Sequence, residues 1–305
     1  MLFKNLILYR LPENWSVPAA ELEEALNRRP LQPCSGFDMQ TRGFVVCGHE
    51  ERLLYTQGRH HLLALGVDRK LLPASVINQQ AKERAVELAA QQGYPVGRRQ
   101  MRELKARITD ELRARALTSR RITHAWLNPV QGWLVVNTTS AARAEEVVET
   151  LRETLGSFAV QPVASQNSPA GAMAAWLMQG RVPGRFSIDH DLELQAVDGG
   201  GATIRYVNHP LDSAEIRHHL GAGMTPTRLG LVWNERIACM LQQNLYLRRL
   251  RFLDVYKDDN AQGESPQEQF DIDFALMTGE LSQLLDEVLS ALGGEEKTAP
   301  VRQAA

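Results

Sequence analysis

The densest cluster of basic side chains in the sequence lies between Gly97 and Arg121. This stretch holds nine Lys or Arg residues and three acids, so six positive charges have no local partner. The segment from Asp254 to Glu296 has the opposite bias, with twelve acids and one lysine, although the net charge of the chain is only −2. Segregated charge creates a local field despite a nearly neutral total. Such a basic stretch is typical of a surface that binds a polyanion and releases its counterions.

These basic residues are expected on one helix and at the start of the strand that follows it. A solvated helix face, with arginines paired to Glu103, Asp110 and Glu111, is the alternative interpretation of the charge run. The excess of six positive charges favours an external polyanion. No helix-turn-helix, zinc-finger or ribonucleoprotein motif accompanies it, so no base-reading element is predicted. The basic positions are Arg98, Arg99, Arg102, Lys105, Arg107, Arg113, Arg115, Arg120 and Arg121.

Nucleotide and metal signatures are missing from the sequence. It contains neither a GxxxxGK phosphate loop nor a GxGxxG after a strand. The adjacent pairs His60-His61 and His218-His219 point in different directions on a strand or a helix, so neither pair can chelate a metal as a unit. Three cysteines without CxxC spacing indicate buried thiols rather than disulfides or a zinc ribbon. No cofactor and no metal site are predicted.

Two groups of carboxylates could suggest catalysis. The segment Asp189-His190-Asp191 resembles an acid–base cluster, but it is expected in a polar turn with no nucleophile nearby. Asp271, Asp273 and Glu280 could suggest a divalent-metal nuclease, because carboxylates bind the hard cations that activate water. Their spacing fits no ligand pattern, and a position near a helix N-terminus explains them better. No catalytic residue is predicted.

Hydrophobic periodicity predicts an α+β fold with largely antiparallel sheets. Strand patterns fill most of the segment from Phe3 to Leu72, including a hairpin that turns at Gly58, and they resume after Arg121. Two helices are predicted between these strands. The first runs to Gln92 with Ser75 as its cap, and the second runs from about Arg98 to Ala116. The pair therefore forms a helical excursion from a sheet.

The predicted domains follow from this pattern. Residues 1–72 and 122–164 form a central α+β domain, residues 73–121 form the inserted basic excursion, and residues 165–305 form a second α+β domain. The boundary is placed where Pro, Ser, Asn and Gly accumulate, around Gln161 to Gly171. The last helix has a continuous apolar stripe, and a disordered tail is expected from about residue 295. The longest apolar runs are far shorter than the roughly 18 residues that span a bilayer, so a cytoplasmic location is expected.

Several segments together resemble one known family. They include LLPASVINQ, LRRLRFLD, FDIDFALMTGELSQLLDEVLSALGGE, the amino-terminal FKNLILYRL, and LDSAEIRHHLGAG followed by LVWNERI. In this order they are similar to the RdgC recombination-associated proteins of bacteria, and the resemblance covers nearly the whole chain. It implies a homodimer closed into a ring, with a positively charged central hole through which duplex DNA passes. It further implies DNA binding without sequence preference, association with the nucleoid, restraint of RecA-driven strand exchange, and no enzymatic activity.

The resemblance also carries over to particular residues. The family pattern is rich in lysine at Lys70, Arg98, Arg99, Arg102 and Lys105, which are therefore expected phosphate contacts. The expected DNA-binding set is completed by further basic residues: Lys82, Arg84, Arg107, Arg120 and Arg121.

Two positions depart from the family pattern. Relatives can carry lysines where this chain has Tyr206 to His209, which weakens the expectation of a DNA contact there. Leu117 stands where relatives can have a larger aromatic residue, so it is expected to make a smaller apolar dimer contact. Three alternatives stay open at this point: binding of single strands as well as duplex, a protein-interaction module whose basic helix meets an acidic partner, and a metal-dependent DNA-processing enzyme.

Overall fold

One antiparallel sheet runs through the whole molecule. The structure, a computed structural model, describes residues 2–13, 15–197, 201–253 and 263–296. Within these residues twelve strands pair in the order β2-β4-β5-β6-β1-β12-β11-β10-β8-β9, with β3 added to β4 and β7 added to β1. The predicted α+β class with antiparallel pairing is confirmed.

The elements have the following bounds. The helices are α1 (Ala19–Asn27), α2 (Ala74–Gln92), α3 (Arg98–Arg115), α4 (Ala141–Leu155), α5 (Pro169–Gln179), α6 (Ala214–Gly221) and α7 (Pro266–Ala291). The strands are β1 (Leu6–Arg10), β2 (Gln40–Val45), β3 (Leu54–Gln57), β4 (His60–Lys70), β5 (Thr118–Asn128), β6 (Trp133–Asn137), β7 (Gln161–Pro162), β8 (Phe186–Ala196), β9 (Thr203–Tyr206), β10 (Met224–Trp233), β11 (Ile237–Gln242) and β12 (Leu247–Phe252).

Strand β1 joins the two halves of the sheet. It pairs with β6 along its whole length and meets β12 at Leu6, opposite Leu247. Because side chains alternate along a strand, Leu6 and Leu8 enter one hydrophobic core and Ile7 and Tyr9 enter the other. The sheet is thus buried on both faces at its centre, and it continues past the segment where the domain boundary was placed.

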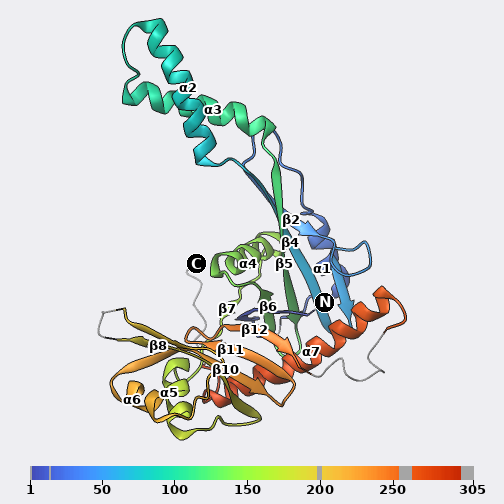
Figure 1. The fold of residues 1–305 in the computed structure, drawn as a ribbon. Coiled ribbons are helices and arrows are strands. Elements are labelled where there is room, and N and C mark those ends of the chain that lie inside the picture. The colour runs from blue at the N-terminus through green and yellow to red at the C-terminus, as the bar shows by residue number, and fades with distance from the viewer. Residues whose placement is uncertain (1, 14, 198–200, 254–262, 297–305) are drawn as a thin grey trace, which may run out of the picture.

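Helices α2 and α3 project from the end of the sheet (Figure 1). We call these residues, 74–115, the arm. They stand on β4 and β5, which pair from His61 opposite Leu127 to Lys70 opposite Thr118. The predicted helical excursion is therefore confirmed. Its own core is thin, because Ala81, Ala85 and Ile108 are the buried residues of the two helices. The predicted Ser75 cap is wrong: Pro73 occupies the N-cap position, with no side-chain cap.

Helix α7 covers one face of both halves of the sheet. Its residues Leu281, Leu284 and Leu285 are fully buried in the core that also contains Trp126 of β5 and Trp233 of β10. The helix begins at Pro266, and Ser265 caps it by accepting from the Glu268 amide.

The residues after α7 are held against the body of the protein. Glu295 pairs with Ser165 in a β-bridge and forms an ion pair with Arg10, Nη2 to Oε2 at 2.5 Å. The backbone amide of Glu296 donates to the carbonyl oxygen of Ala164. Disorder from residue 295 is therefore wrong for these two residues, and residues 297–305 lie outside the described part of the chain.

Candidate nucleic-acid interface

Five of the predicted DNA contacts are unpaired cations of the arm. Among the described residues none of them makes an ion pair, in contrast to their neighbours on the same helices. Four of the five side chains belong to exposed residues, and Lys105 is half-buried. Their charges are therefore available to an external anion. The five are Lys82, Arg98, Arg102, Lys105 and Arg107.

Other basic residues of the arm are neutralised by acids. Arg84 of α2 binds Glu111 of α3 through both terminal nitrogens, at 3.0 and 2.6 Å, and this ion pair lowers the pKa of the Glu111 carboxyl. Arg99 pairs with Glu103 at 3.0 Å, one turn away on the same helix. The interpretation as a solvated, paired face thus holds for these residues but not for the five unpaired cations.

Arg120 and Arg121 are paired where the arm meets the sheet. Arg120 donates from Nε and Nη2 to the two carboxylate oxygens of Asp68, both at 2.8 Å, and holds the pKa of Asp68 below its usual value. Arg121 pairs with Glu146 of α4. Both positions lie beside the arm, but neither carries uncompensated charge.

Lys70 requires a correction. The residue is only 5% exposed, and its ammonium donates to the carbonyl oxygens of Ser35, of Gly36 at 3.3 Å and of Arg113 at 2.9 Å. A buried ammonium whose three protons are donated to backbone oxygens cannot also contact a phosphate. Lys70 therefore anchors the end of α3 to the loop before β2, and the expected phosphate contact is withdrawn.

An exposed apolar patch lies at the same junction, and we call it the arm-base patch. It consists of Phe37, Leu71 and Leu117, whose exposed fractions are 89%, 52% and 78%. The Leu71 amide donates to the Leu117 carbonyl at 2.8 Å, and Arg113 donates to the Phe37 carbonyl at 3.4 Å. Sequence reasoning identified Leu117 but missed Phe37, because only the fold brings residue 37 to the base of the arm, where Arg113 contacts it.

The carboxylates that suggested a nuclease each have a separate structural partner. Asp271 accepts from the Tyr55 hydroxyl at 2.5 Å, and Glu280 accepts from Arg236 of the β10–β11 turn at 2.5 Å. Asp271 and Asp273 lie beyond the first turn of α7, so the expected position at the helix entry is wrong for them. In the described ranges no group of three or more His, Cys, Asp or Glu side chains is arranged to hold a metal ion.

The other candidate groups are also in structural settings. Burial lowers the pKa of His60 and of His61, which favours neutral rings, and the His60 ring accepts from Trp126 at 3.2 Å. Burial raises the pKa of Cys47 to about 11 and that of Cys239 to about 12, so both remain neutral thiols. Among the described residues, every helix is too short or too polar to span a lipid bilayer.

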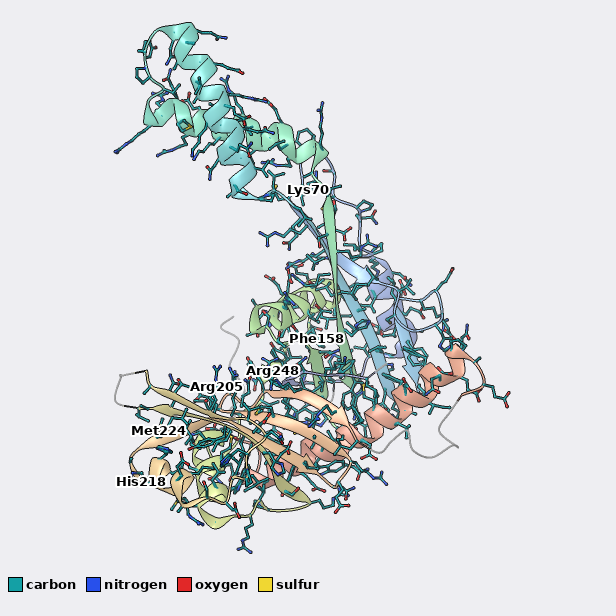
Figure 2. All side chains as sticks on the ribbon, in the orientation of Figure 1. Lys70, Phe158, Arg205, His218, Met224 and Arg248 are labelled. Atoms are coloured by element: carbon teal, nitrogen blue, oxygen red, sulfur yellow. The ribbon has the colours of Figure 1, made fainter. Side chains whose placement is uncertain are left out.

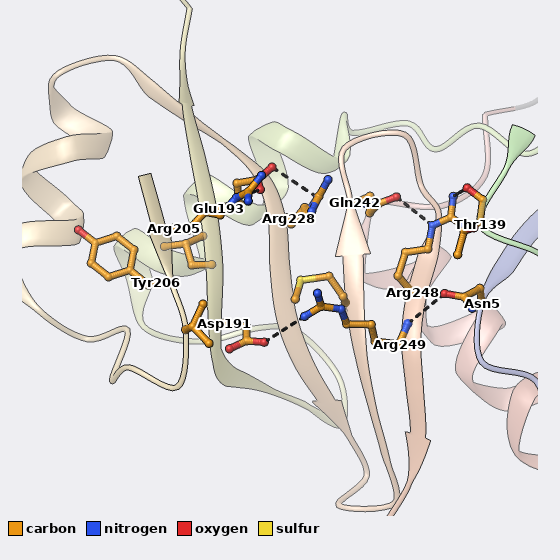
Figure 3. A pocket seen from close by; sticks show the side chains of 13 residues that line it. Asn5, Thr139, Asp191, Glu193, Arg205, Tyr206, Arg228, Gln242, Arg248 and Arg249 are labelled. Atoms are coloured by element: carbon orange, nitrogen blue, oxygen red, sulfur yellow. Dashed lines mark hydrogen bonds and ion pairs between the residues drawn. The ribbon is translucent and has the colours of Figure 1, made fainter. Parts of the chain in front are cut away.

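A second group of arginines escaped the sequence reasoning. Arg205, Arg228 and Arg249 lie on three strands of the β8–β12 region around a hollow of about 550 Å³ (Figure 3). Each is more than twenty residues from the next along the chain, so no single charge run contains all three.

Comparisons with known proteins agree over the whole length of the chain. A family model described as "RdgC: Putative exonuclease, RdgC" matches residues 1–295. A protein named "Recombination-associated protein RdgC" from Dechloromonas aromatica (strain RCB) is 46% identical over 299 residues, which cover 97% of this chain and 98% of the relative. Proteins of the same name from Herminiimonas arsenicoxydans and Burkholderia orbicola (strain MC0-3) are 41% and 42% identical, over 97% and 100% of this chain and 99% of each relative.

Proposed function

The chain belongs to the RdgC family of recombination-associated proteins, and on that premise we propose that it binds duplex DNA through the phosphate backbone, without preference for base sequence. The observation that carries the proposal is the set of five unpaired cations on the arm. Cations without a protein partner gain most from phosphates, because counterions released from the DNA drive the association. Binding that depends on phosphates alone carries no sequence information.

The proposal includes a homodimer that closes into a ring around the duplex. A two-fold ring requires two self-complementary contacts between the copies. The arm-base patch supports one of them, because Phe37 and Leu117 are large apolar side chains that are almost fully exposed in the single chain. The arm would then place its unpaired cations beside the enclosed DNA.

In the cell this binding would act on recombination. A protein that surrounds a duplex and covers its backbone withholds that duplex from strand exchange, so we propose that it restrains RecA-dependent homologous recombination as a nucleoid-associated cytoplasmic protein. The relatives are named recombination-associated proteins, which supports a role in this process. Single-stranded DNA has the same phosphates, and titration with a single strand measures whether it binds as well.

We propose that the protein is not an enzyme, and the second candidate function is that of a nuclease. The description of the matching family model, which names an exonuclease, is the observation that favours the second candidate. Incubation with linear duplex and Mg²⁺ or Mn²⁺ separates the two. The proposal predicts intact DNA, and cleavage that requires the metal would favour the nuclease.

Titration of two unrelated duplexes of equal length tests the proposed binding. The proposal predicts equal affinities that fall steeply between about 50 and 200 mM salt. A further comparison of closed circular DNA with the same DNA linearised tests the ring, because a closed ring leaves linear DNA through its ends but stays on a circle after a salt challenge. Binding to an acidic peptide but to neither duplex would favour the protein-interaction module instead.

A further inference from the structure

The sheet formed by β8 to β12 has one face without a helical cover. Helices α5 and α6 contact β10 on the other face, where α7 also joins the core. The face opposite them, which we call the open face, surrounds the hollow lined by Arg228, Arg248 and Arg249. Figure 2 places Arg205 and Arg248 on the side of this sheet that is turned toward α4 and the arm. The open face is therefore on the arm's side of the molecule.

A bulge in β12 directs Arg249 onto the open face. Ala238 pairs with Arg251 and Met240 pairs with Arg248, so one residue of β11 is opposed by two residues of β12, Arg249 and Leu250. Leu250 is buried in the core, and its amide donates to the Lys4 carbonyl at 2.9 Å. Arg249 adopts a φ of 51°, a conformation that residues other than Gly, Asn and Asp rarely adopt. Bulges of this kind often redirect a side chain beside a functional site, and backbone strain concentrates there.

A second bulge, in β8, places two aspartates on the same face. Leu229 pairs with Leu192 and Leu231 pairs with Ile188, so the three residues 189–191 oppose the single residue Gly230. A Cβ atom on Gly230 would lie 3.1 Å from the Cβ of Asp189 and 3.4 Å from that of Asp191. Both aspartates therefore lie over Gly230, whereas in a regular ladder each residue of β8 would have its own partner on β10. The segment that resembled an acid–base cluster forms a pair of anions facing β12.

The aspartates and the arginines of the open face are only loosely paired. Arg249 Nη1 lies 3.9 Å from Asp191, and Arg251 Nη2 lies 3.9 Å from Asp189, beyond hydrogen-bonding distance. The two arginine side chains are 74% and 70% exposed. Arg205 and Arg228 share Glu193 at 2.6 and 3.4 Å. An incoming anion could therefore replace the carboxylates of Asp189 and Asp191 without breaking a close hydrogen bond.

Arg248 has a structural role in the same region. It donates to the carbonyl of Thr138, to the Thr139 carbonyl at 2.8 Å and to Gln242 at 3.1 Å, and its guanidinium lies 4.9 Å from the centre of the Tyr246 ring. It fixes β12 to the segment after β6 and is nearly buried. The arginines of the open face that can exchange a carboxylate for an incoming anion are therefore Arg249 and Arg251, with Arg205 and Arg228 beside them.

We propose that the open face is a second phosphate-binding surface for the backbone of a nucleic acid, separate from the arm. Arg249 and Arg251 are its principal contacts, and Asp189 and Asp191 compete with the phosphates and keep the contact weak. The row from β12 to β9 crosses four strand spacings, about 19 Å at ~4.8 Å each, which is too wide for one phosphate and suits a length of backbone. This inference rests on the proposed function, because the ligand is the same DNA.

A charge-matched pair of double variants tests the surface. In Arg249→Gln/Arg251→Gln we expect the affinity for a short random-sequence duplex to fall roughly tenfold at moderate salt, and the slope of log K against log salt to flatten by about 1 to 2. The control is Arg181→Gln/Arg217→Gln, which removes the same charge from the helical layer on the opposite face, after α5 and within α6. A sheet variant that behaves like this control would overturn the proposal.

Two further variants separate binding from folding. Arg249→Gly keeps the positive φ and relieves its strain, so we expect an equal or higher melting temperature together with weaker DNA binding. A variant that is more stable and binds as tightly as the unmodified protein would assign Arg249 a purely structural role and overturn the proposal. Asp189→Asn/Asp191→Asn removes the competing anions and is expected to tighten binding several-fold, whereas unchanged or weaker binding would contradict their role.

Two further comparisons show whether the bound phosphate belongs to a nucleic acid or to a small anion, and whether a negative result contradicts the second surface or the proposed function. Inorganic phosphate that saturates the open face at low concentration, followed by thermal shift in the unmodified and Arg249→Gln/Arg251→Gln proteins, would indicate a small-anion site and overturn the assignment to nucleic acid. If substitutions in the arm abolish DNA binding while those of the sheet do not, the second surface is wrong and the proposed function stands. If the unmodified protein binds no duplex, the proposed function itself fails.

Discussion

Asp68 and Arg120 face each other across β4 and β5 and join their side chains in a two-pronged ion pair, with both donor–acceptor distances at 2.8 Å. The pair lies two residues before Lys70, at the point where the two strands carry the arm away from the sheet. The Asp68 side chain is 6% exposed, whereas that of Arg120 is 54% exposed. The ion pair therefore stabilises the base of the arm, and Arg120 is not free to act as a DNA contact.

Replacing Arg120 with Gln should lower the stability of the protein. The change leaves the Asp68 carboxylate without its partner, which is expected to reduce the free energy of unfolding at neutral pH. Urea titration measures the loss. Arg28→Gln, which breaks the exposed pair between Arg28 and Glu24, is the control and should change stability by less than about 0.5 kcal/mol.

The effect of Arg120→Gln should also depend on pH. Arg120 lowers the pKa of folded Asp68 below the ordinary value of 3.8, so the stabilisation is complete above that value and is lost as the pH falls through the folded-state pKa. The difference between the two proteins should accordingly be constant near neutrality and shrink below about pH 4. A difference that persists undiminished in acid would show that the ion pair is not its cause.

Substitutions of Lys70 and Lys82 should have different effects, because Lys70 has a structural role and Lys82 is proposed to bind DNA. Lys70→Met leaves three carbonyl oxygens without their shared donor and is expected to cost about 2–3 kcal/mol of unfolding free energy. Lys82→Met removes an exposed charge from α2 and should leave stability nearly unchanged while weakening DNA binding. Thermal melting and duplex titration on both variants test this. If Lys70→Met retains full stability and Lys82→Met retains full affinity, the two assignments are wrong.

The arm-base patch should control self-association. Leu117→Asp and Phe37→Asp place charges in the proposed contact between copies and should shift sedimentation toward the monomer without unfolding the chain, because both side chains are exposed. Val86→Asp is the control, since Val86 lies on the arm and is 71% exposed but outside the patch. A dimer of unchanged strength in both patch variants would remove this contact from the ring.

Local sequence patterns predicted the helices and hairpins that are determined by residues close together in the sequence. The predicted hairpin turns at Gly58, which has a φ of 60° between β3 and β4. The spacing of apolar residues gave both arm helices to within a residue at most ends. These patterns report which side of an element is buried, and burial is what they predict reliably.

Features that depend on distant residues could not be predicted in this way. Lys70 is satisfied by carbonyls at residues 35, 36 and 113, a set that only the folded chain brings together. The bulge at Arg249 breaks the two-residue period, because Leu247 and Leu250 both enter the core, so alternation assigns Arg249 to the wrong face. The distinction between paired and unpaired arginines likewise depends on contacts between helices, such as Arg84 with Glu111.

The salt dependence of DNA binding by an arm variant tests the central claim most directly. The variant replaces four of the unpaired cations of α3, Arg98, Arg102, Lys105 and Arg107, with Gln, which has a helix propensity close to that of Arg and Lys. A comparison variant, Arg84→Gln/Arg99→Gln, changes two cations that are already paired with acids. Both should keep melting temperatures close to that of the unmodified protein, because exposed ion pairs contribute only ~0–1 kcal/mol each.

For the α3 variant we predict a loss of duplex affinity by orders of magnitude at moderate salt, and a slope of log K against log salt that is flatter by about 3 to 4, nearly one for each phosphate contact removed. The comparison variant should retain most of the slope. An α3 variant that folds normally and binds duplex with the slope and affinity of the unmodified protein would contradict the arm as the DNA-facing element.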